Sequence, residues 1–128
     1  MKCNVKVELN RKNLDTLHRA KKIALYKTAE AIKNDIASRQ VVPMDTSELE
    51  NSGFVDDSLI DEMVACVVYD TPYARRWYFN TENVKFQKTK NPNAQDHWMD
   101  YYLDGEGKQW VIETYATFLK QESKGIIK

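Results

Sequence analysis

An apolar run from Met63 to Tyr69 is the feature that most constrains how this chain can fold. In an extended backbone its side chains alternate between two faces, and both faces are apolar. A strand of this kind is normally covered on both sides, so the run predicts the covered centre of a sheet. Thr71 follows as the expected N-cap of a helix, and Pro72 as its first residue, where the missing N–H carries no penalty. We therefore expect the chain to pass from a covered strand directly into a helix.

Two other segments are expected to pair with this strand. Residues 2–9 alternate between apolar and polar side chains, which predicts a half-buried strand. Phe54 and Val55 begin another strand, which returns through a turn at 56–58. We predict that residues 53–70 form an antiparallel hairpin that pairs with residues 2–9. The apolar face of the 2–9 strand consists of Cys3, Val5, Val7 and Leu9.

A long helix is expected between these two parts of the sheet. Asn10 or Asn13 can cap its beginning, and apolar residues at helical spacing continue to about Ser38, which corresponds to a length of about 40 Å. Basic residues fall mostly between the apolar ones, so the outer face of the helix is basic. A stripe this wide needs a surface to cover it, and we expect the helix to pack across the sheet.

Shorter helices are expected in the rest of the chain. A capping box, formed by Asp45 with Glu48 or by Ser47 with Glu50, predicts one helical turn, which Gly53 ends in the left-handed conformation. Asn91 and Pro92 repeat the cap-then-proline start, and the last helix covers about 108–122. Residues 80–91 are expected to form an exposed loop, and the tail 123–128 to fray. The helix after Pro92 is expected to carry Ala94, Trp98, Tyr101 and Tyr102 to a break at 104–107.

These elements together predict an α+β fold in a single domain, residues 1–128. We expect a small mixed or antiparallel sheet of about three or four strands, packed against the long N-terminal helix, with shorter C-terminal helices. The composition, 42% apolar and 30% charged, is typical of a soluble globular protein. No apolar run approaches the roughly 20 residues that cross a membrane, and no secretion signal is seen, so we expect a cytoplasmic origin.

The charges are balanced overall but unevenly distributed. Lys and Arg together number 19, as do Asp and Glu, so no global field recruits nucleic acid. Residues 1–42 nevertheless carry ten basic and four acidic side chains, whereas residues 43–70 carry eight acidic and no basic ones. Such segments suit complementary contacts, either within one chain or between copies.

The residues that could carry chemistry favour ordinary structural roles. Cys3 and Cys66 are expected to be buried thiols. His18 and His97 have no partner at metal-binding spacing, and we expect no metal, no cofactor and no enzymatic activity. The acidic cluster after Val55 is more typical of a solvated hairpin turn than of a nuclease metal site. That cluster consists of Asp56, Asp57, Asp61 and Glu62.

Two stretches combine basic and aromatic residues, as single-strand nucleic-acid binding requires. They are Arg75 and Arg76 before Trp77, and the Lys85–Lys90 loop. The alternative for the first stretch is that Trp77 is core and the arginines pair with the acidic segment 43–70. The alternatives for the loop are a solvated connection and an arm that orders against a neighbouring subunit.

The order of three short motifs resembles the minor capsid or tail-completion proteins of siphophage head–tail connectors. A proline-and-threonine turn follows the long helix, here Pro43 to Ser52, with Ser47 where the family usually has glycine. The strand then ends in Tyr-x-x-Pro-Tyr-Ala, here 69–74, and a variable loop leads to Pro-x-Ala-x-x-x-Trp, here 92–98. The motif and core residues are Pro43, Thr46, Leu49, Tyr69, Pro72, Tyr73, Ala74, Trp77, Ala94 and Trp98.

The resemblance implies a structural role without catalytic residues. Such proteins form part of the joint between capsid and tail, often as a homo-oligomeric ring around the DNA exit channel. The implied partners are other connector and tail proteins, with non-specific proximity to DNA and no membrane. The implied location is the virion head–tail junction, assembled in the cytoplasm of a bacterial host.

A ring needs two complementary patches on each copy. We hypothesise that the basic helix face and the segment 43–62 are these patches. A small nucleic-acid-binding module is the main alternative function, and a metal-dependent nuclease is a more distant one. The candidate interface residues are Lys22, Lys27, Asp56, Asp57, Asp61, Arg75, Arg76, Lys85, Lys88 and Lys90.

Overall fold

The computed structural model describes residues 3–5, 8, 10–43 and 48–127. The N-terminal half contains helix α1 (Arg11–Arg39), helix α2 (Glu48–Asn51), strand β1 (Gly53–Asp56), the 3-10 helix η1 (Ile60–Glu62) and strand β2 (Cys66–Tyr69). The C-terminal half contains helices α3 (Ala74–Phe79), α4 (Asp100–Leu103) and α5 (Gly107–Glu122). The fold is α+β, as the sequence predicts.

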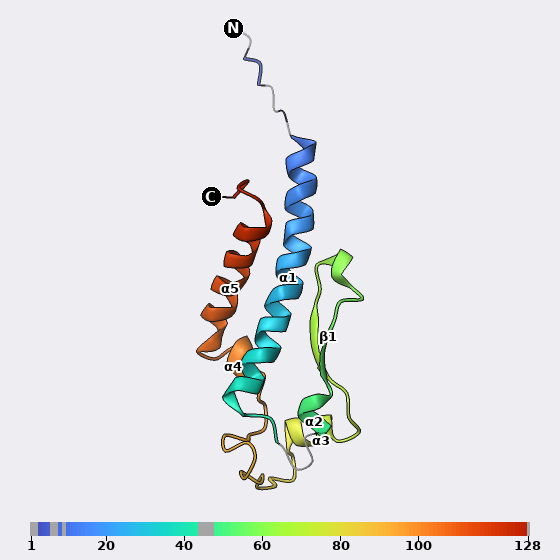
Figure 1. Cartoon of the computed structure of the whole chain (residues 1–128), viewed down its shortest axis with the longest axis vertical. Coiled ribbons are helices and arrows are strands. Elements are labelled where there is room, and N and C mark those ends of the chain that lie inside the picture. Colours follow the sequence, from blue (N-terminus) through green and yellow to red (C-terminus); the bar gives the residue numbers. More distant parts are fainter. Residues whose placement is uncertain (1–2, 6–7, 9, 44–47, 128) are drawn as a thin grey trace.

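Helix α1 is the central element of the molecule (Figure 1). Helix α5 runs antiparallel along one side of it, and the β1–β2 hairpin lies along another side. The hairpin tip, which carries η1, is directed towards the N-terminal end of α1. The segments containing α2, α3 and the chain before α4 gather at the C-terminal end of α1. The long helix therefore connects two differently built ends.

The predicted N-terminal helix is confirmed, including its cap. Asn10 is extended, and its side-chain oxygen accepts a hydrogen bond from the Asn13 amide at 3.1 Å. This bond satisfies one of the amides that have no partner within the helix. The helix ends at Gln40, which adopts the left-handed conformation at φ 55°. The buried side chains of α1 are mostly small, which allows close packing of its neighbours: Ala20, Ala24, Thr28, Ala29 and Ile36.

The predicted hairpin is also confirmed, but the predicted sheet of three or four strands is wrong. β1 and β2 pair antiparallel, with Phe54 opposite Val68 and Asp56 opposite Cys66, in a two-stranded sheet. The described residues in the expected 2–9 strand, 3–5 and 8, are exposed and form no strand. The remaining residues of that segment lie outside the described part of the chain. Alternation along a segment does not determine whether a partner strand lies within its reach.

The run from Met63 to Tyr69 is not the covered centre of a sheet. Val67 and Tyr69 are half-buried, whereas Val64 and Cys66 are exposed. Within the described residues, β2 has only β1 as a neighbour. The predicted burial of both cysteines is also wrong, since Cys3 and Cys66 are both exposed.

Gly53 is needed for a different reason from the one predicted. Its φ is not positive, so it does not end α2 in a left-handed conformation. A Cβ atom at this position would lie 2.9 Å from the Tyr69 ring and 3.3 Å from the Glu50 carbonyl oxygen. Glycine therefore permits the close approach of the two strands to α2. The capping-box residues Asp45 and Ser47, and the motif residue Thr46, lie outside the described residues.

The helix expected to begin at Pro72 begins two residues later. Tyr73 occupies the N-cap position of α3 without a side-chain bond, and the Thr71 carbonyl accepts the Ala74 amide at 3.2 Å. The predicted cap of this helix is therefore wrong. The Thr71 hydroxyl is buried and has no hydrogen-bond partner within the part of the chain that is described.

The long helix expected after Pro92 is reduced to α4, because the preceding backbone bonds to other segments. The Gln95 amide donates to the Val41 carbonyl at 2.9 Å, and the His97 amide donates to the Tyr78 carbonyl at 2.8 Å. His97 also has a positive φ of 48°, which interrupts a helix. Ala94 and Trp98 therefore lie in turns that connect distant parts of the chain.

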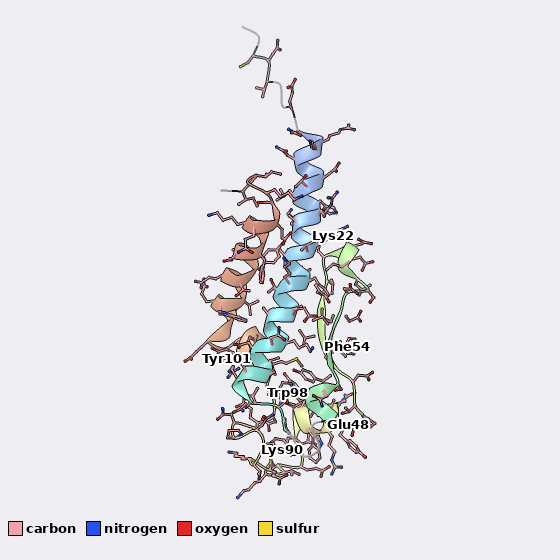
Figure 2. The ribbon with its side chains drawn as sticks, in the orientation of Figure 1. Lys22, Glu48, Phe54, Lys90, Trp98 and Tyr101 are labelled. Atoms are coloured by element: carbon pink, nitrogen blue, oxygen red, sulfur yellow. The ribbon has the colours of Figure 1, made fainter. Side chains whose placement is uncertain are left out.

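The hydrophobic core lies at the C-terminal end of α1, around Trp98 (Figure 2). Trp98 is 1% exposed, and its ring forms T-shaped contacts with the rings of Tyr78 and Tyr69, at centroid distances of 4.8 and 5.7 Å. The predicted last helix is confirmed as α5, and its tail begins as a turn with Ser123 fully buried. The expected fraying is therefore not observed at Ser123. The buried core residues are Ile36, Val41, Val42, Leu49, Ala74, Trp98 and Tyr102.

Candidate interaction site at the C-terminal end of α1

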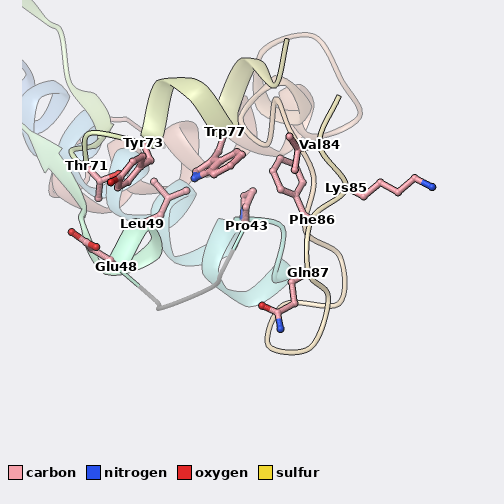
Figure 3. A pocket seen from close by; sticks show the side chains of 10 residues that line it. All are labelled: Pro43, Glu48, Leu49, Thr71, Tyr73, Trp77, Val84, Lys85, Phe86 and Gln87. Atoms are coloured by element: carbon pink, nitrogen blue, oxygen red, sulfur yellow. The ribbon is translucent and has the colours of Figure 1, made fainter. Parts of the chain in front are cut away.

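A pocket of about 500 Å³ opens beside the core, between α2, α3 and the segment 84–87 (Figure 3). Its walls are mainly apolar and aromatic, with Glu48 and Lys85 as the charged members. The lining residues are Pro43, Glu48, Leu49, Thr71, Tyr73, Trp77, Val84, Lys85, Phe86 and Gln87. A concave, mainly apolar surface with a few polar groups is the usual form of a small-molecule binding site or an active site.

Helix α3 and the following loop hold the pocket walls in place. The Trp77 ring meets the Phe86 ring edge-on at 5.9 Å. Asn80 ends α3 in the left-handed conformation, and its side chain exchanges two hydrogen bonds of 2.9 Å with the backbone of Val84. The loop 80–91 is largely exposed, as predicted, but these contacts attach its first half to α3.

The polar groups near the pocket are few. The buried Thr71 hydroxyl lines the pocket without a described hydrogen-bond partner. The Lys85 side chain points away from the pocket into solvent in Figure 3. Behind α2, burial and the nearby Glu50 charge raise the pKa of Tyr69 to about 12, so this phenol is neutral at physiological pH.

A second, shallower surface lies on the other side of α3. It has a volume of about 510 Å³ and is lined by Pro72, Arg75, Arg76, Phe79 and Thr81. The Arg75 guanidinium lies 5.9 Å from the Phe79 ring centroid, and Arg76 lies 5.0 Å from that of Trp77. Arg76 also pairs with Glu82 at 2.9 Å. The observed ion pair of Arg76 is thus with the loop, and not with the acidic segment 43–70 as the alternative interpretation supposed.

The candidate interface lysines of α1 make contacts within the chain. Lys22 donates to Asp61 at 2.8 Å, and this bond lowers the pKa of the Asp61 carboxyl. Lys27 pairs with Glu122 and lies 5.9 Å from the Phe118 ring. The observed ion pairs of both lysines are therefore within the chain. The Lys22 pair joins α1 to the hairpin tip, and the Lys27 pair joins α1 to α5.

The remaining interface candidates lie in separate places. Asp56 accepts the Ser58 amide at 2.9 Å, and this bond lowers the pKa of Asp56. Asp57 is exposed beside it, whereas Lys85, Lys88 and Lys90 are exposed on the loop at the opposite end of the molecule. The ten residues do not form a single patch.

The motif residues, in contrast, come together. Leu49, Ala74 and Trp98 are members of one buried cluster, with Tyr69 and Trp77 packed against it. Pro43 and Ala94 are also buried, whereas Pro72 and Tyr73 are exposed at its surface, Tyr73 by 54%. Three motifs that are separated in sequence therefore describe one packed unit.

Sequence reasoning missed two features that build this unit. Phe86 is a pocket wall, and its signal was that it is one of two apolar residues in a polar loop. Asn91 was interpreted as a helix cap, but it is 3% exposed and its side chain donates to the Val42 carbonyl at 2.8 Å. It joins the loop to the end of α1, which local sequence patterns do not reveal.

Other site types find little support in the described part of the chain. No three His, Cys, Asp or Glu side chains among residues 3–5, 8, 10–43 and 48–127 are placed to hold a metal ion. The His97 ring packs against the rings of Tyr78 and Phe79, with centroid distances of 5.1 and 5.7 Å. None of the helices formed by the described residues is long and apolar enough to cross a membrane.

In comparisons with known proteins, no family model, no curated protein and no solved structure matches this chain.

Proposed function

We propose that this chain is a structural component of a tailed-phage virion, a minor capsid or tail-completion protein at the head–tail joint that acts through ring-type subunit contacts. The observation that carries the proposal is the convergence of the motif residues. Leu49, Ala74 and Trp98 share one buried cluster, although the motifs lie far apart in sequence. The order and spacing of the three motifs thus correspond to one packed structural unit, as a family signature should.

The surface of this unit supports a role in contacts with other proteins. Tyr73 and Phe79 are exposed large aromatic side chains next to the two arginines of α3. Exposed aromatic residues combined with arginine are typical of protein interfaces, where they supply most of the binding energy. The proposed partners are further copies of this chain and other connector and tail proteins.

Deletion of the coding sequence from the phage genome that carries it tests the proposal. We expect electron microscopy to show DNA-filled heads and separate tails, and expression of the wild-type chain in trans to restore joined particles. A variant with Tyr73→Ala and Phe79→Ala should fold but fail to restore joining, whereas the matched control Ile112→Ala, at an exposed position of α5, should restore it. Normal joined particles after the deletion would refute the proposal.

A nucleic-acid-binding module is a second candidate, because α3 and the loop are brought together. Arg76 contacts Glu82, and Trp77 contacts Phe86, so the two basic–aromatic stretches form one end of the molecule. Phosphate contacts make binding fall steeply as salt rises. We expect a single-stranded oligonucleotide to distinguish this candidate: binding at low salt that is lost with Arg75→Ala and kept with Lys12→Ala would support it, and no binding would exclude it.

A further inference from the structure

The segment before α1 has the pattern of a strand but not the burial of one. Its apolar row begins with Cys3 and Val5 and continues with Val7 and Leu9 in the sequence. In the structure Cys3 is exposed and Val5 is 85% exposed. Each buried valine contributes roughly 1.5–3 kcal/mol, so a row of this kind gains substantially from a partner surface.

The β1–β2 hairpin, in turn, has no third strand among the described residues. A two-stranded hairpin is marginal on its own, and a further strand with an apolar face stabilises it. Val55 and Val67, on the side that faces α1, are only half-buried. Among the described residues the sheet has only β1 and β2, so each of these strands has an outer edge to which one more strand can add.

The segment of the same chain can reach only the part of these edges next to the hairpin tip. Lys22 contacts Asp61 at the hairpin tip, and from Arg11 to Lys22 the helix rises about 16 Å. Residues 3–9 extend at most about 23 Å from Asn10, because a strand advances about 3.3 Å per residue. Folding back therefore brings the segment only just past the tip. The paired strands lie further along α1, as the positions of Lys22 and Phe54 in Figure 2 show.

We propose that the segment carrying Cys3 and Val5 of one copy adds as a third strand to the β1–β2 hairpin of a second copy. The main-chain groups of an unpaired strand edge then bind the added backbone, and its apolar row packs against α1 of the second copy. The contact is heterologous, since segment and hairpin are different surfaces, and it can close a ring or be exchanged within a dimer. It does not require the proposed virion role.

Sedimentation of the purified full chain over a wide concentration range tests this contact. We expect reversible self-association, and Val5→Asp should weaken it by about tenfold or more, because a carboxylate replaces a buried apolar side chain. Asn4→Asp is the matched control: it adds the same charge at the neighbouring exposed position on the other face and should leave the association unchanged. Val5 is exposed in the single chain, so both variants should melt like the wild type at low concentration.

Hydrogen exchange supplies the second readout. Amides of the segment and of one hairpin strand should become protected only at concentrations where the chain associates. A chain that stays monomeric, an equal effect of the two variants, or a segment already protected in the monomer would each overturn the proposal. Self-association as expected, together with normal particles after gene deletion, would refute the proposed function alone. Unjoined heads and tails together with a strictly monomeric chain would refute this contact alone.

Discussion

Replacement of Trp98 by alanine should be among the most destabilising single changes in this chain. The side chain is 1% exposed, and its ring packs against Tyr78 and Tyr69 from two other segments. Removal of a buried tryptophan costs about 3–5 kcal/mol, since the cavity adds to the lost transfer free energy. The total free energy of unfolding of a small domain is about 5–15 kcal/mol, so the variant should be partly unfolded near physiological temperature.

Urea unfolding followed by far-ultraviolet circular dichroism measures the effect. Trp110→Ala is the matched control, because Trp110 is 36% exposed on α5 and has one ring contact, with Tyr102 at 6.0 Å. We expect a loss of about 1 kcal/mol or less for the control. Trp98→Phe should lie between the two: it keeps a ring and removes an indole N–H that is buried without a described partner. Equal losses for Trp98→Ala and Trp110→Ala would contradict the assignment of the core to this end of α1.

Three further predictions concern pH, charge and close packing. The pKa of Tyr69 is raised to about 12, so the folded state holds the phenol proton more tightly than the unfolded state does. The contribution of this group to the unfolding free energy should therefore be fully present below about pH 10 and be lost between pH 10 and 12. Tyr69→Phe should flatten the plot of urea midpoint against pH in that range. Lys22→Glu should reduce the unfolding free energy by only about 1 kcal/mol or less, because Asp61 is largely exposed, and the added change Asp61→Lys should recover the loss in a double-mutant cycle. Gly53→Ala should cost about 1–3 kcal/mol in thermal or urea unfolding, since the new methyl group would lie 2.9 Å from the Tyr69 ring; a neutral result would mean that the Tyr69 ring can move aside easily.

Elements with local signals were predicted well from the sequence. Asn10 caps α1 as expected, and strands 53–56 and 66–69 pair as a hairpin, although their connection at 57–65 carries η1 and is longer than the expected turn at 56–58. These features depend on side-chain periodicity and on bonds between residues close in sequence. The same holds for α5, whose apolar spacing and the glycines at 105 and 107 define where it begins.

Segments whose backbone amides donate hydrogen bonds to residues distant in sequence could not be predicted in this way. The segment 91–99 contains a proline start like that of a helix, but Gln95 and His97 donate to Val41 and Tyr78 instead. The candidate site was missed in part for the same reason, because Phe86 becomes a pocket wall only when Asn80 attaches the loop to α3. A local pattern states what a segment can form, whereas the contacts available to it decide what it does form.

The two ends of α1 are stabilised by different interactions, and this difference connects the fold to the proposed assembly. At the C-terminal end, buried aromatic packing around Trp98 fixes the motif segments. In the middle, α1 packs against its neighbours through small buried residues such as Ala24 and Ala29, and the ion pairs to the hairpin tip and α5 have exposed members and add little in water. Beyond them the first turns of α1 are exposed, including the apolar Leu14. Such a gradient places the lowest local stability next to the segment that carries Val5. A second copy that binds there would order the least stable end of the molecule while leaving the motif core unchanged.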